Sequence, residues 1–212
     1  MFPAAVETSR LRLERAGRET VDVRELYRIS SADDGIEDVT EHVPWSPHEN
    51  PKETAEFLDS CEERFREGEN ANYVIRPREG EDGAGEFAGM GGLRCEWDRD
   101  RAELGIWLRK RFWGRGYSGE RAFALMRLAF ERLDFGLVAV GVVAENDRSR
   151  RAVEKYVEAT GGQFEGVVRH GLPFDDGAVR DEARYSVSRA EWRDSDADRS
   201  SSSVRFLDSL DD

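Results

Sequence analysis

The sequence predicts a mixed α+β fold: a single domain with a twisted, mostly antiparallel sheet of about seven strands and about four helices. Three observations favour this class. Three strand patterns follow one another in the middle of the chain, helical patterns flank this meander, and one later strand pattern is continuously apolar. The 212 residues suit one well-buried domain, and the absence of an apolar run of about 18 residues argues against a membrane span.

The first third of the chain predicts one strand and two helices. Residues 7–14 alternate apolar and polar side chains, as a half-buried strand does. Apolar residues at helical spacing predict helices over residues 20–29 and 54–65. Prolines break the segment between these helices, which also carries Trp45. We interpret Trp45 either as a cover over the helices or as one wall of an acceptor pocket.

The middle of the chain predicts the antiparallel meander, with turns rich in glycine or acidic residues between its strands. Its three strands are expected at residues 72–77, 86–95 and 101–108. An amphipathic helix over residues 118–133 follows. The continuous apolar strand at residues 137–144 comes next, and its composition indicates burial on both faces.

The last elements of the domain are a helix and a closing hairpin, at residues 146–157, 165–169 and 183–189. We therefore expect one domain over residues 1–192. The remaining residues, 193–212, are acidic and rich in serine, which predicts a flexible tail. Within this tail, residues 204–210 are expected to form a short helical turn.

The chain is strongly acidic, with 45 acidic and 32 basic residues and a net charge of −13. Only three of the basic residues are lysines. We interpret this composition as an adaptation to high salt, and a high-GC genome is the alternative. A general nucleic-acid-binding function is disfavoured because no basic face could dominate such a charge.

Three further observations concern compartment and metal content. The N-terminus lacks the basic-then-apolar layout of a signal peptide, which favours a cytoplasmic protein. Cys61 and Cys95 are too few for a disulfide framework and are interpreted as free thiols, with a single bridge as the alternative. The three histidines lack the spacing of metal ligands, so no metal is expected.

The most informative segment lies between the third meander strand and the following helix, and its glycines include Gly114, Gly116 and Gly119. Glycines let backbone N–H groups approach an anion, and a helix N-terminus adds partial positive charge there. The segment therefore predicts a phosphate site. Residues 114–119 also fit the dinucleotide pattern G-x-G-x-x-G, but a meander rather than a βαβ unit surrounds them, which disfavours that alternative.

The pattern Arg111-x-x-Gly114-x-Gly116, after a strand and before an amphipathic helix, resembles the GNAT superfamily of acyl-CoA N-acyltransferases. Glu103-Leu-Gly-Ile-Trp-Leu108, followed by Phe112-Trp-Gly-Arg-Gly-Tyr117, is similar to the branch that includes the RimJ/RimL ribosomal-protein N-terminal acetyltransferases. The segment Asn146-x-x-Ser149 also resembles that branch. The resemblance extends from Thr8 through Trp192. It implies a V-shaped splay between the strands at residues 102–108 and 137–144.

The resemblance also implies acetyl-CoA as cosubstrate. The coenzyme's pyrophosphate would contact the N–H groups of the glycine segment, and its pantetheine arm would run along the preceding strand. Arg109, Lys110, Arg111 and Arg115 form a basic island beside the glycines, which favours phosphate contact over a role as solvated surface charge. The residues expected to bind the coenzyme are Ile106, Trp107, Leu108, Arg109, Arg111, Gly114, Arg115, Gly116, Tyr117, Ser118, Asn146 and Ser149.

The reaction of the family is direct attack of an amine on the acetyl thioester. A base must first remove a proton from the amine, and a donor assists the departing thiolate. Glu103 is the candidate base, with a structural salt bridge as the alternative. Ser149 is the candidate donor, while Asn146 contacts the pantetheine or simply caps the helix. Many relatives carry a tyrosine at the position of Val153, so Ser149 or water would take that role here.

We therefore expect an acetyl-CoA-dependent N-acetyltransferase, acting on the N-terminal amine of a protein or peptide. A small-molecule amine is the alternative acceptor, and a catalytically idle acyl-CoA-binding module is the alternative class. The family builds its acceptor pocket from regions corresponding to residues 20–65 and 165–185, whose acidic side chains suit a cationic amine or a basic peptide. A monomer or homodimer without nucleic-acid or membrane partners is expected.

Overall fold

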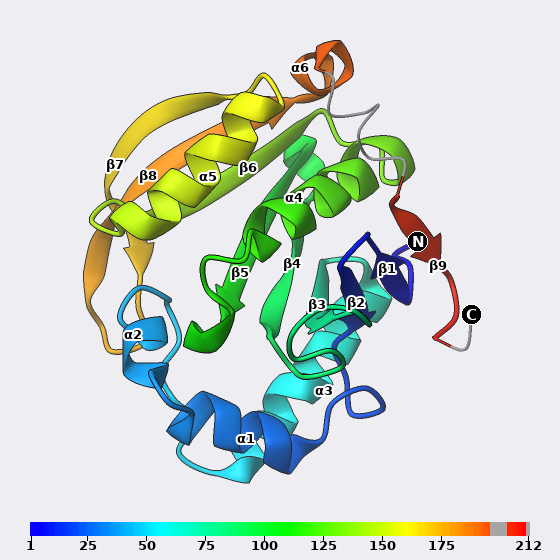
Figure 1. Ribbon diagram of the computed structural model, residues 1–212. Coiled ribbons are helices and arrows are strands. Elements are labelled where there is room, and N and C mark those ends of the chain that lie inside the picture. Colours follow the sequence, from blue (N-terminus) through cyan, green and yellow to red (C-terminus); the bar gives the residue numbers. More distant parts are fainter. Residues whose placement is uncertain (196–202, 211–212) are drawn as a thin grey trace.

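The computed structural model describes residues 1–195 and 203–210, and its strands form one nine-stranded sheet in the order β7-β8-β6-β5-β4-β3-β2-β1-β9 (Figure 1). The mixed, mostly antiparallel α+β fold is thereby confirmed, with more strands than expected. The strands are β1 Ala5–Glu7, β2 Leu11–Arg15, β3 Asn70–Pro77, β4 Gly89–Glu96, β5 Arg101–Leu108, β6 Leu137–Val143, β7 Gln163–Pro173, β8 Val179–Ser188 and β9 Arg205–Leu207.

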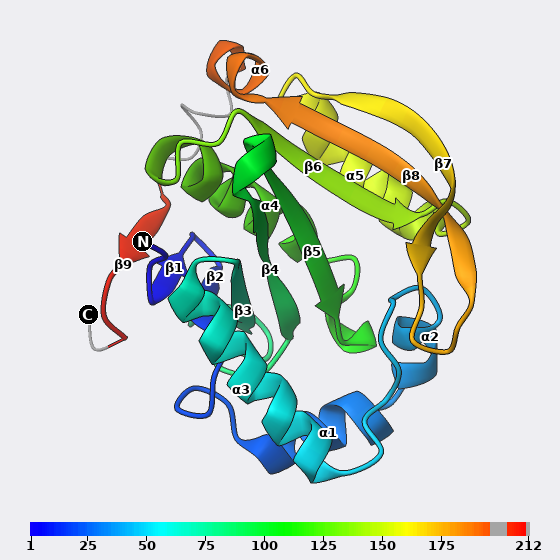
Figure 2. The same ribbon diagram turned by 180° about the vertical axis from the view of Figure 1, so that it is seen from behind.

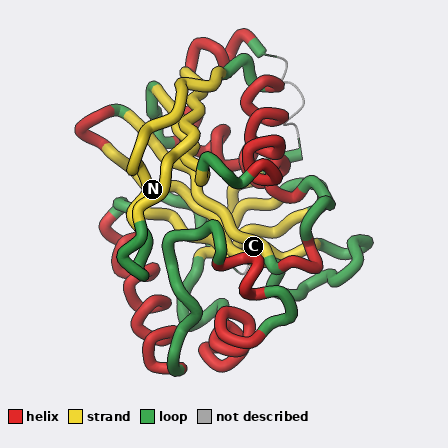
Figure 3. The backbone as a smooth tube through the Cα atoms, turned by 90° about the vertical axis from the view of Figure 1, so that its left-hand side faces the viewer, coloured by secondary structure: helices red, strands yellow, loops and turns green. Residues whose placement is uncertain are grey.

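Helices cover both faces of the sheet. Helices α4 and α5 lie on one face, while α1 and α3 lie on the other (Figures 1 and 2). The view from the side shows the strands between these two groups (Figure 3). The helices are α1 Val23–Ala32, α2 Ile36–Thr40, α3 Pro51–Glu67, α4 Tyr117–Arg127, α5 Asp147–Ala159 and α6 Arg189–Asp194. Short 3-10 turns occupy Trp97–Arg99 and Lys110–Phe112, and a π turn at Leu128–Arg132 prolongs α4.

Each face of the sheet has its own apolar core. The core under α4 and α5 contains Leu104, Leu125, Val138 and Tyr185, all nearly inaccessible to solvent. The core under α1 and α3 contains Leu26, Leu58, Val74 and Met90. Successive side chains along a strand therefore point to opposite faces and meet different helices. The sequence pattern indicated this same period of two residues.

Strands β5 and β6 are the parallel pair of the sheet, and they pair over only four residues. Their register runs from Arg101↔Leu137 to Leu104↔Val140. Beyond this point β5 continues along β4 and β6 continues along β8, so the two strands diverge (Figure 2). This divergence confirms the V-shaped splay that the resemblance implied.

Three segments differ from the sequence-based expectation. Residues 7–14 make a hairpin, β1 and β2, because the Thr8 N–H and the Leu11 carbonyl close a tight turn between them. Residues 36–40, for which the sequence predicted no element, form the short helix α2. Residues 204–210 were expected as a helical turn, and this was wrong: β9 pairs antiparallel with β1, with Ala5 opposite Leu207. The unpaired backbone groups of an edge strand provide that partner, which local sequence does not reveal.

The C-terminal segment therefore returns to the sheet beside the N-terminus (Figure 1). Residues 196–202 and 211–212 of the predicted flexible tail lie outside the described residues. Cys61 and Cys95 are free thiols, as expected, and burial raises their pKa values to about 11 and about 12. Among the described helices, none combines the length and apolarity needed to cross a membrane.

One buried charge stands out in the core. Arg121 on α4 is 1% exposed, and its Nε and Nη1 atoms have no hydrogen-bond partner among the described residues. The side chain passes close to Gly91 of β4. The buried hydroxyl of Tyr156, which interacts electrostatically with Arg121, is likewise unpartnered among those residues. Burial lowers the pKa of Arg121, because a guanidinium removed from water loses its hydration.

We expect the substitution Arg121→Met to stabilise the folded protein by about 1 kcal/mol or more, because it replaces an uncompensated buried charge with an apolar side chain of similar length. Urea denaturation measures the free energy of unfolding. Arg24→Met, at an exposed position of α1, serves as the control. A less stable Arg121→Met protein would contradict the expectation.

Candidate active site

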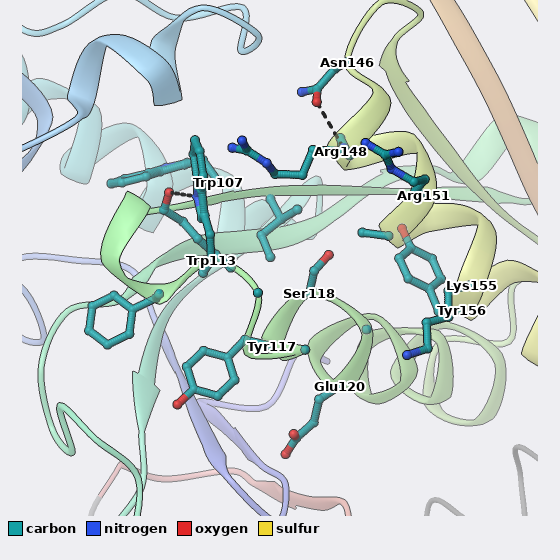
Figure 4. A pocket seen from close by; sticks show the side chains of 18 of the residues that line it. Trp107, Trp113, Tyr117, Ser118, Glu120, Asn146, Arg148, Arg151, Lys155 and Tyr156 are labelled. Atoms are coloured by element: carbon teal, nitrogen blue, oxygen red, sulfur yellow. Dashed lines mark hydrogen bonds between the residues drawn. The ribbon is translucent and has the colours of Figure 1, made fainter.

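A cavity of about 1520 Å³ opens on the face of the sheet that α4 and α5 cover. Its walls come from the end of β5, the glycine segment, the first turn of α4 and one side of α5 (Figure 4). Sequence-predicted residues that line it are Ile106, Trp107, Leu108, Gly114, Gly116, Tyr117, Ser118, Asn146 and Ser149. The splay of β5 from β6 thus gathers residues from segments that are far apart in the sequence.

The glycine segment adopts a conformation that requires its glycines. Gly114 and Gly116 have φ values of 78° and 79°, in the left-handed region that other residues rarely adopt. The buried ring of Phe112 anchors the segment to the core. The indole N–H of Trp113 donates a 2.8 Å hydrogen bond to the carbonyl of Leu108, which ties the segment to the end of β5 (Figure 4).

The N-terminus of α4 faces this cavity without a cap. Gly116 is the N-cap residue, and the first turn of the helix has no side-chain cap hydrogen bond within the described part of the chain. The first N–H groups of a helix have no partner within the helix and carry partial positive charge. Ser118 adds a hydroxyl group on the cavity side (Figure 4). This arrangement suits a phosphate group.

The cations of the basic island have acidic partners outside the glycine segment. Arg109 makes two 2.7 Å hydrogen bonds to the carboxylate of Asp33, which joins the end of β5 to the end of α1. The other three cations make ion pairs of 2.6–2.7 Å: Lys110 with Asp38, Arg111 with Glu86, and Arg115 with Asp82. These contacts fix the segment to its surroundings, so phosphate binding by Arg109, Arg111 and Arg115 side chains stays a prediction.

Three other cations line the cavity from α5, namely Arg148, Arg151 and Lys155 (Figure 4). The guanidinium of Arg148 stacks on the ring of Trp113, 4.2 Å from the ring centroid. Within the described chain, none of these three cations makes an ion pair. None of the three was among the residues expected from the sequence to bind the coenzyme. Their spacing of three and four residues along a predicted helix was the signal, because it places them on one face.

Asn146 and Ser149 lie at the start of α5. The Asn146 side-chain oxygen accepts a 3.0 Å hydrogen bond from the Ser149 N–H, so the helix-capping alternative is realised while both residues line the cavity. Val153 is buried, and Tyr156 on the next turn also borders the cavity. Burial raises the pKa of the Tyr156 hydroxyl to about 12, which keeps it protonated as a potential donor.

A second cavity, of about 360 Å³, opens on the opposite face of the sheet. Residues of α1, α3, the loop around Trp45 and strands β3, β4 and β5 form its walls. Trp45 packs edge-on against Trp107, with ring centroids 5.2 Å apart. Ile106 and Trp107 line both cavities, so the two meet at the splayed part of β5.

Glu103 lies in the second cavity, on the face opposite Leu104. Its carboxylate accepts a 2.5 Å hydrogen bond from Arg94 on the neighbouring strand, and this contact raises the pKa of Arg94. The salt bridge, which was the alternative role for Glu103, is therefore present, and the role of Glu103 as a base stays a prediction. The position agrees with a role in proton transfer only if the amine enters from this side of the sheet.

His48, at the edge of the second cavity, is half-buried, and its Nδ1 atom lies 2.8 Å from the Thr54 hydroxyl. Burial lowers the pKa of His48, while the charge of Glu53 opposes this shift. A histidine with a lowered folded-state pKa contributes stability above its unfolded pKa of about 6.5, and that contribution is lost as the pH falls.

We therefore expect the free energy of unfolding to fall more steeply between about pH 7 and pH 5 in the parent protein than in a His48→Gln variant. Chemical denaturation at several pH values measures both slopes, and the comparison removes the contribution of the many carboxylates. Equal slopes would show that His48 does not contribute to the pH dependence of the free energy of unfolding.

The sequence of this chain also matches a known protein family. The sequence profile of the GNAT acetyltransferase domain matches residues 10–156, which is more than half of the chain. A Bacillus subtilis (strain 168) protein, YdaF, whose name places it among ribosomal N-acetyltransferases, is 34% identical over 92 residues. That match covers 43% of this chain and 48% of YdaF, so the chain spans about half the length of this relative.

Solved structures share the fold over most of its length. A protein from T. thermophilus, named as an acetyltransferase, is 30% identical with a TM-score of 0.69, over 91% of this chain and 93% of that one. The ribosomal L7/L12 α-N-protein acetyltransferase RimL, solved with coenzyme A, has a TM-score of 0.71 at 19% identity, over 85% and 95% of the two chains. With a family profile over most of the domain and the splayed sheet in place, this chain belongs to the GNAT acetyltransferases.

Proposed function

We propose that this protein is an acetyl-CoA-dependent N-acetyltransferase whose acceptor is the N-terminal amine of a protein or peptide. One observation carries the proposal: two cavities on opposite faces of the sheet meet at Ile106 and Trp107. One cavity offers an anion site, and the other holds a carboxylate beside the meeting point. This arrangement suits a two-substrate transfer, because each substrate can enter from its own face.

The residues of the larger cavity fit coenzyme A. The uncapped N-terminus of α4 and the left-handed Gly114 and Gly116 suit the pyrophosphate, and the cations of α5 can neutralise further phosphate charge. Residues 105–108 of β5 pair with β4 on one side and with no described strand on the other. Their free backbone groups can pair with the amides of the pantetheine arm. The bound coenzyme would supply the activated acetyl thioester.

The protein's part in the reaction is proton transfer and positioning. Glu103 would take a proton from the incoming ammonium, directly or through water, so that the nitrogen lone pair can attack the acetyl carbon. As the carbon–sulfur bond breaks, the hydroxyl of Ser149 would donate to the sulfur and stabilise its developing charge. Tyr156, protonated and on the same wall, is a second donor of this kind.

Two observations bear on the acceptor. The similarity to YdaF favours a protein N-terminus, and the aromatic walls at Trp45 and Trp107 can flank the first residue of a peptide. The second cavity is also small enough, at about 360 Å³, to enclose a whole small amine. A small-molecule amine is therefore the second candidate.

Release of free coenzyme A thiol tests the proposal directly. We expect release with acetyl-CoA and the peptide Ala-Arg-Tyr-Gly-Gly, and none above hydrolysis with the same peptide acetylated at its N-terminus. Spermidine represents the small amines. Faster release with spermidine than with the peptide would favour the second candidate, and no release with either would leave a coenzyme-binding module without transferase activity.

The substitution Glu103→Gln is expected to lower kcat about 100-fold, because the amide cannot accept the proton of the ammonium. Binding of acetyl-CoA, measured as a thermal shift, should be unchanged, since Glu103 lies on the other face. Glu63→Gln, at an exposed position of α3, is the matched control. A kcat within twofold of the parent value would remove Glu103 as the base.

We expect Arg148→Ala to weaken coenzyme A binding about three- to tenfold, because it removes both a cation and its stacking on Trp113. Isothermal titration with coenzyme A measures the dissociation constant, and Arg24→Ala on α1 is the control. The loss should shrink as the salt concentration rises. An unchanged dissociation constant at low salt would exclude Arg148 from the coenzyme site.

A further inference from the structure

The loop between β3 and β4, residues 78–88, lies against the glycine segment. The loop carries four acidic residues, and two of them pair with arginines of that segment. The carboxylate of Asp82 lies 2.7 Å from Arg115, and the carboxylate of Glu86 lies 2.7 Å from Arg111. Arg115 also donates a 2.8 Å hydrogen bond to the backbone carbonyl of Asp82. The β3–β4 loop therefore contacts the glycine segment through its backbone as well as its side chains.

The buried ring of Phe112 is the apolar centre of this contact. The guanidinium carbon of Arg111 lies 4.8 Å from the ring centroid, and that of Arg115 lies 5.0 Å from it. The loop reaches the ring at Gly83, where an added Cβ atom would lie 3.0 Å from the ring edge. Gly83 also has a φ of 80°, which other residues rarely adopt. The loop, the ring and the two arginines thus pack together.

The two arginines face this loop rather than the larger cavity. Among the described residues that line the larger cavity are Gly114, Gly116 and Ser118, but neither Arg111 nor Arg115. To bind a phosphate in the cavity, each guanidinium would have to leave its carboxylate and the ring on which it stacks. A phosphate would therefore compete with contacts that the free protein already makes.

Arg10, in the turn between β1 and β2, fixes the backbone of the glycine segment itself. Its Nη1 atom donates a 3.0 Å hydrogen bond to the carbonyl of Arg115. Glu120 on α4 holds Arg10 through two contacts of 2.7 Å. A trans peptide is planar, so its N–H points opposite to its carbonyl. Because the carbonyl of Arg115 is bound to Arg10, the N–H of Gly116 has a fixed direction.

We propose that the β3–β4 loop holds the glycine segment in the conformation that binds the coenzyme, and that Arg111 and Arg115 are positioning residues rather than phosphate ligands. The inference rests on the proposed coenzyme binding and adds how its site is maintained. A segment with two left-handed glycines loses conformational freedom when it binds a ligand, and contacts already present in the free protein reduce that loss. The phosphate ligands are then backbone N–H groups and the cations of α5.

Two effects of the loop carboxylates on coenzyme binding have opposite signs. Coenzyme A carries negatively charged phosphates, so Asp82 and Glu86 repel it through space. If Arg111 and Arg115 were phosphate ligands, removal of these carboxylates would also free both guanidinium groups for the coenzyme, and binding would tighten. If the carboxylates hold the segment in place, their removal weakens binding. The sign of the change in affinity therefore separates the two roles.

The double variant Asp82→Ala/Glu86→Ala tests this sign. Exposed ion pairs contribute a few-fold each, so we expect the dissociation constant for coenzyme A to rise about fivefold at low salt, measured by isothermal titration. Glu79→Ala is the matched control, because Glu79 is an exposed acid of the same loop that makes no ion pair within the described chain. An unchanged or lower dissociation constant in the double variant, or an equal rise in Glu79→Ala, would overturn the inference.

An exchange of charges separates positioning from direct contact with the coenzyme. Arg115→Asp puts two carboxylates side by side and should raise the dissociation constant about tenfold, while kcat at saturating acetyl-CoA stays within about twofold of the parent value. Arg115→Asp combined with Asp82→Arg restores an ion pair at the same place. This exchanged protein should return to within about threefold of the parent dissociation constant.

The outcomes distinguish this inference from the proposed function on which it rests. No recovery of affinity in the exchanged protein would show that a guanidinium is needed at position 115 itself, which would overturn the positioning role and leave coenzyme binding standing. A parent protein that binds no coenzyme A would overturn both the proposed function and the role of the β3–β4 loop.

Discussion

The short pairing between β5 and β6 is the constraint on which the rest of the molecule depends. The two strands share hydrogen bonds over four residues, and each then follows a different neighbour. A continuous sheet would separate the space under α4 and α5 from the space under α1 and α3. The splay instead joins the two spaces at Ile106 and Trp107, and it leaves one edge of β5 unpaired within the described chain. The proposed coenzyme binding and the proposed acceptor access both depend on that one opening.

The two helices that border the opening must lie close together without filling it. Gly119 on α4 provides the close approach, because a Cβ atom there would lie 4.0 Å from Cβ of Tyr156 on α5. This contact brings the uncapped N-terminus of α4 beside the cations of α5. Because the chain has a net charge of −13, a positive site requires a local cluster of cations. The acidic partners of Arg109, Arg111 and Arg115 show that nearby cations are otherwise neutralised.

Glycine has three distinct physical roles around this opening. Gly114 and Gly116 supply left-handed backbone in the segment before α4. Gly92 and Gly141 make room for side-chain oxygen atoms from neighbouring strands. A Cβ atom added to Gly105 would meet no described atom within 4 Å. The first role is a property of the backbone. The other two depend on what packs against the glycine, and a pattern of glycines alone does not distinguish them.

The sequence by itself determined the class of fold and most of the elements, and it predicted a phosphate site in the segment from Arg111 to Ser118. These features depend on local physics: side-chain periodicity, the φ range of glycine, and the charge at a helix N-terminus. The tertiary structure decided which cations face the cavity, that residues 205–207 join β1, and that the carboxylate of Glu182 lies against Gly141. Those outcomes depend on contacts between residues far apart in the chain, which hydrophobic pattern and local propensity do not encode.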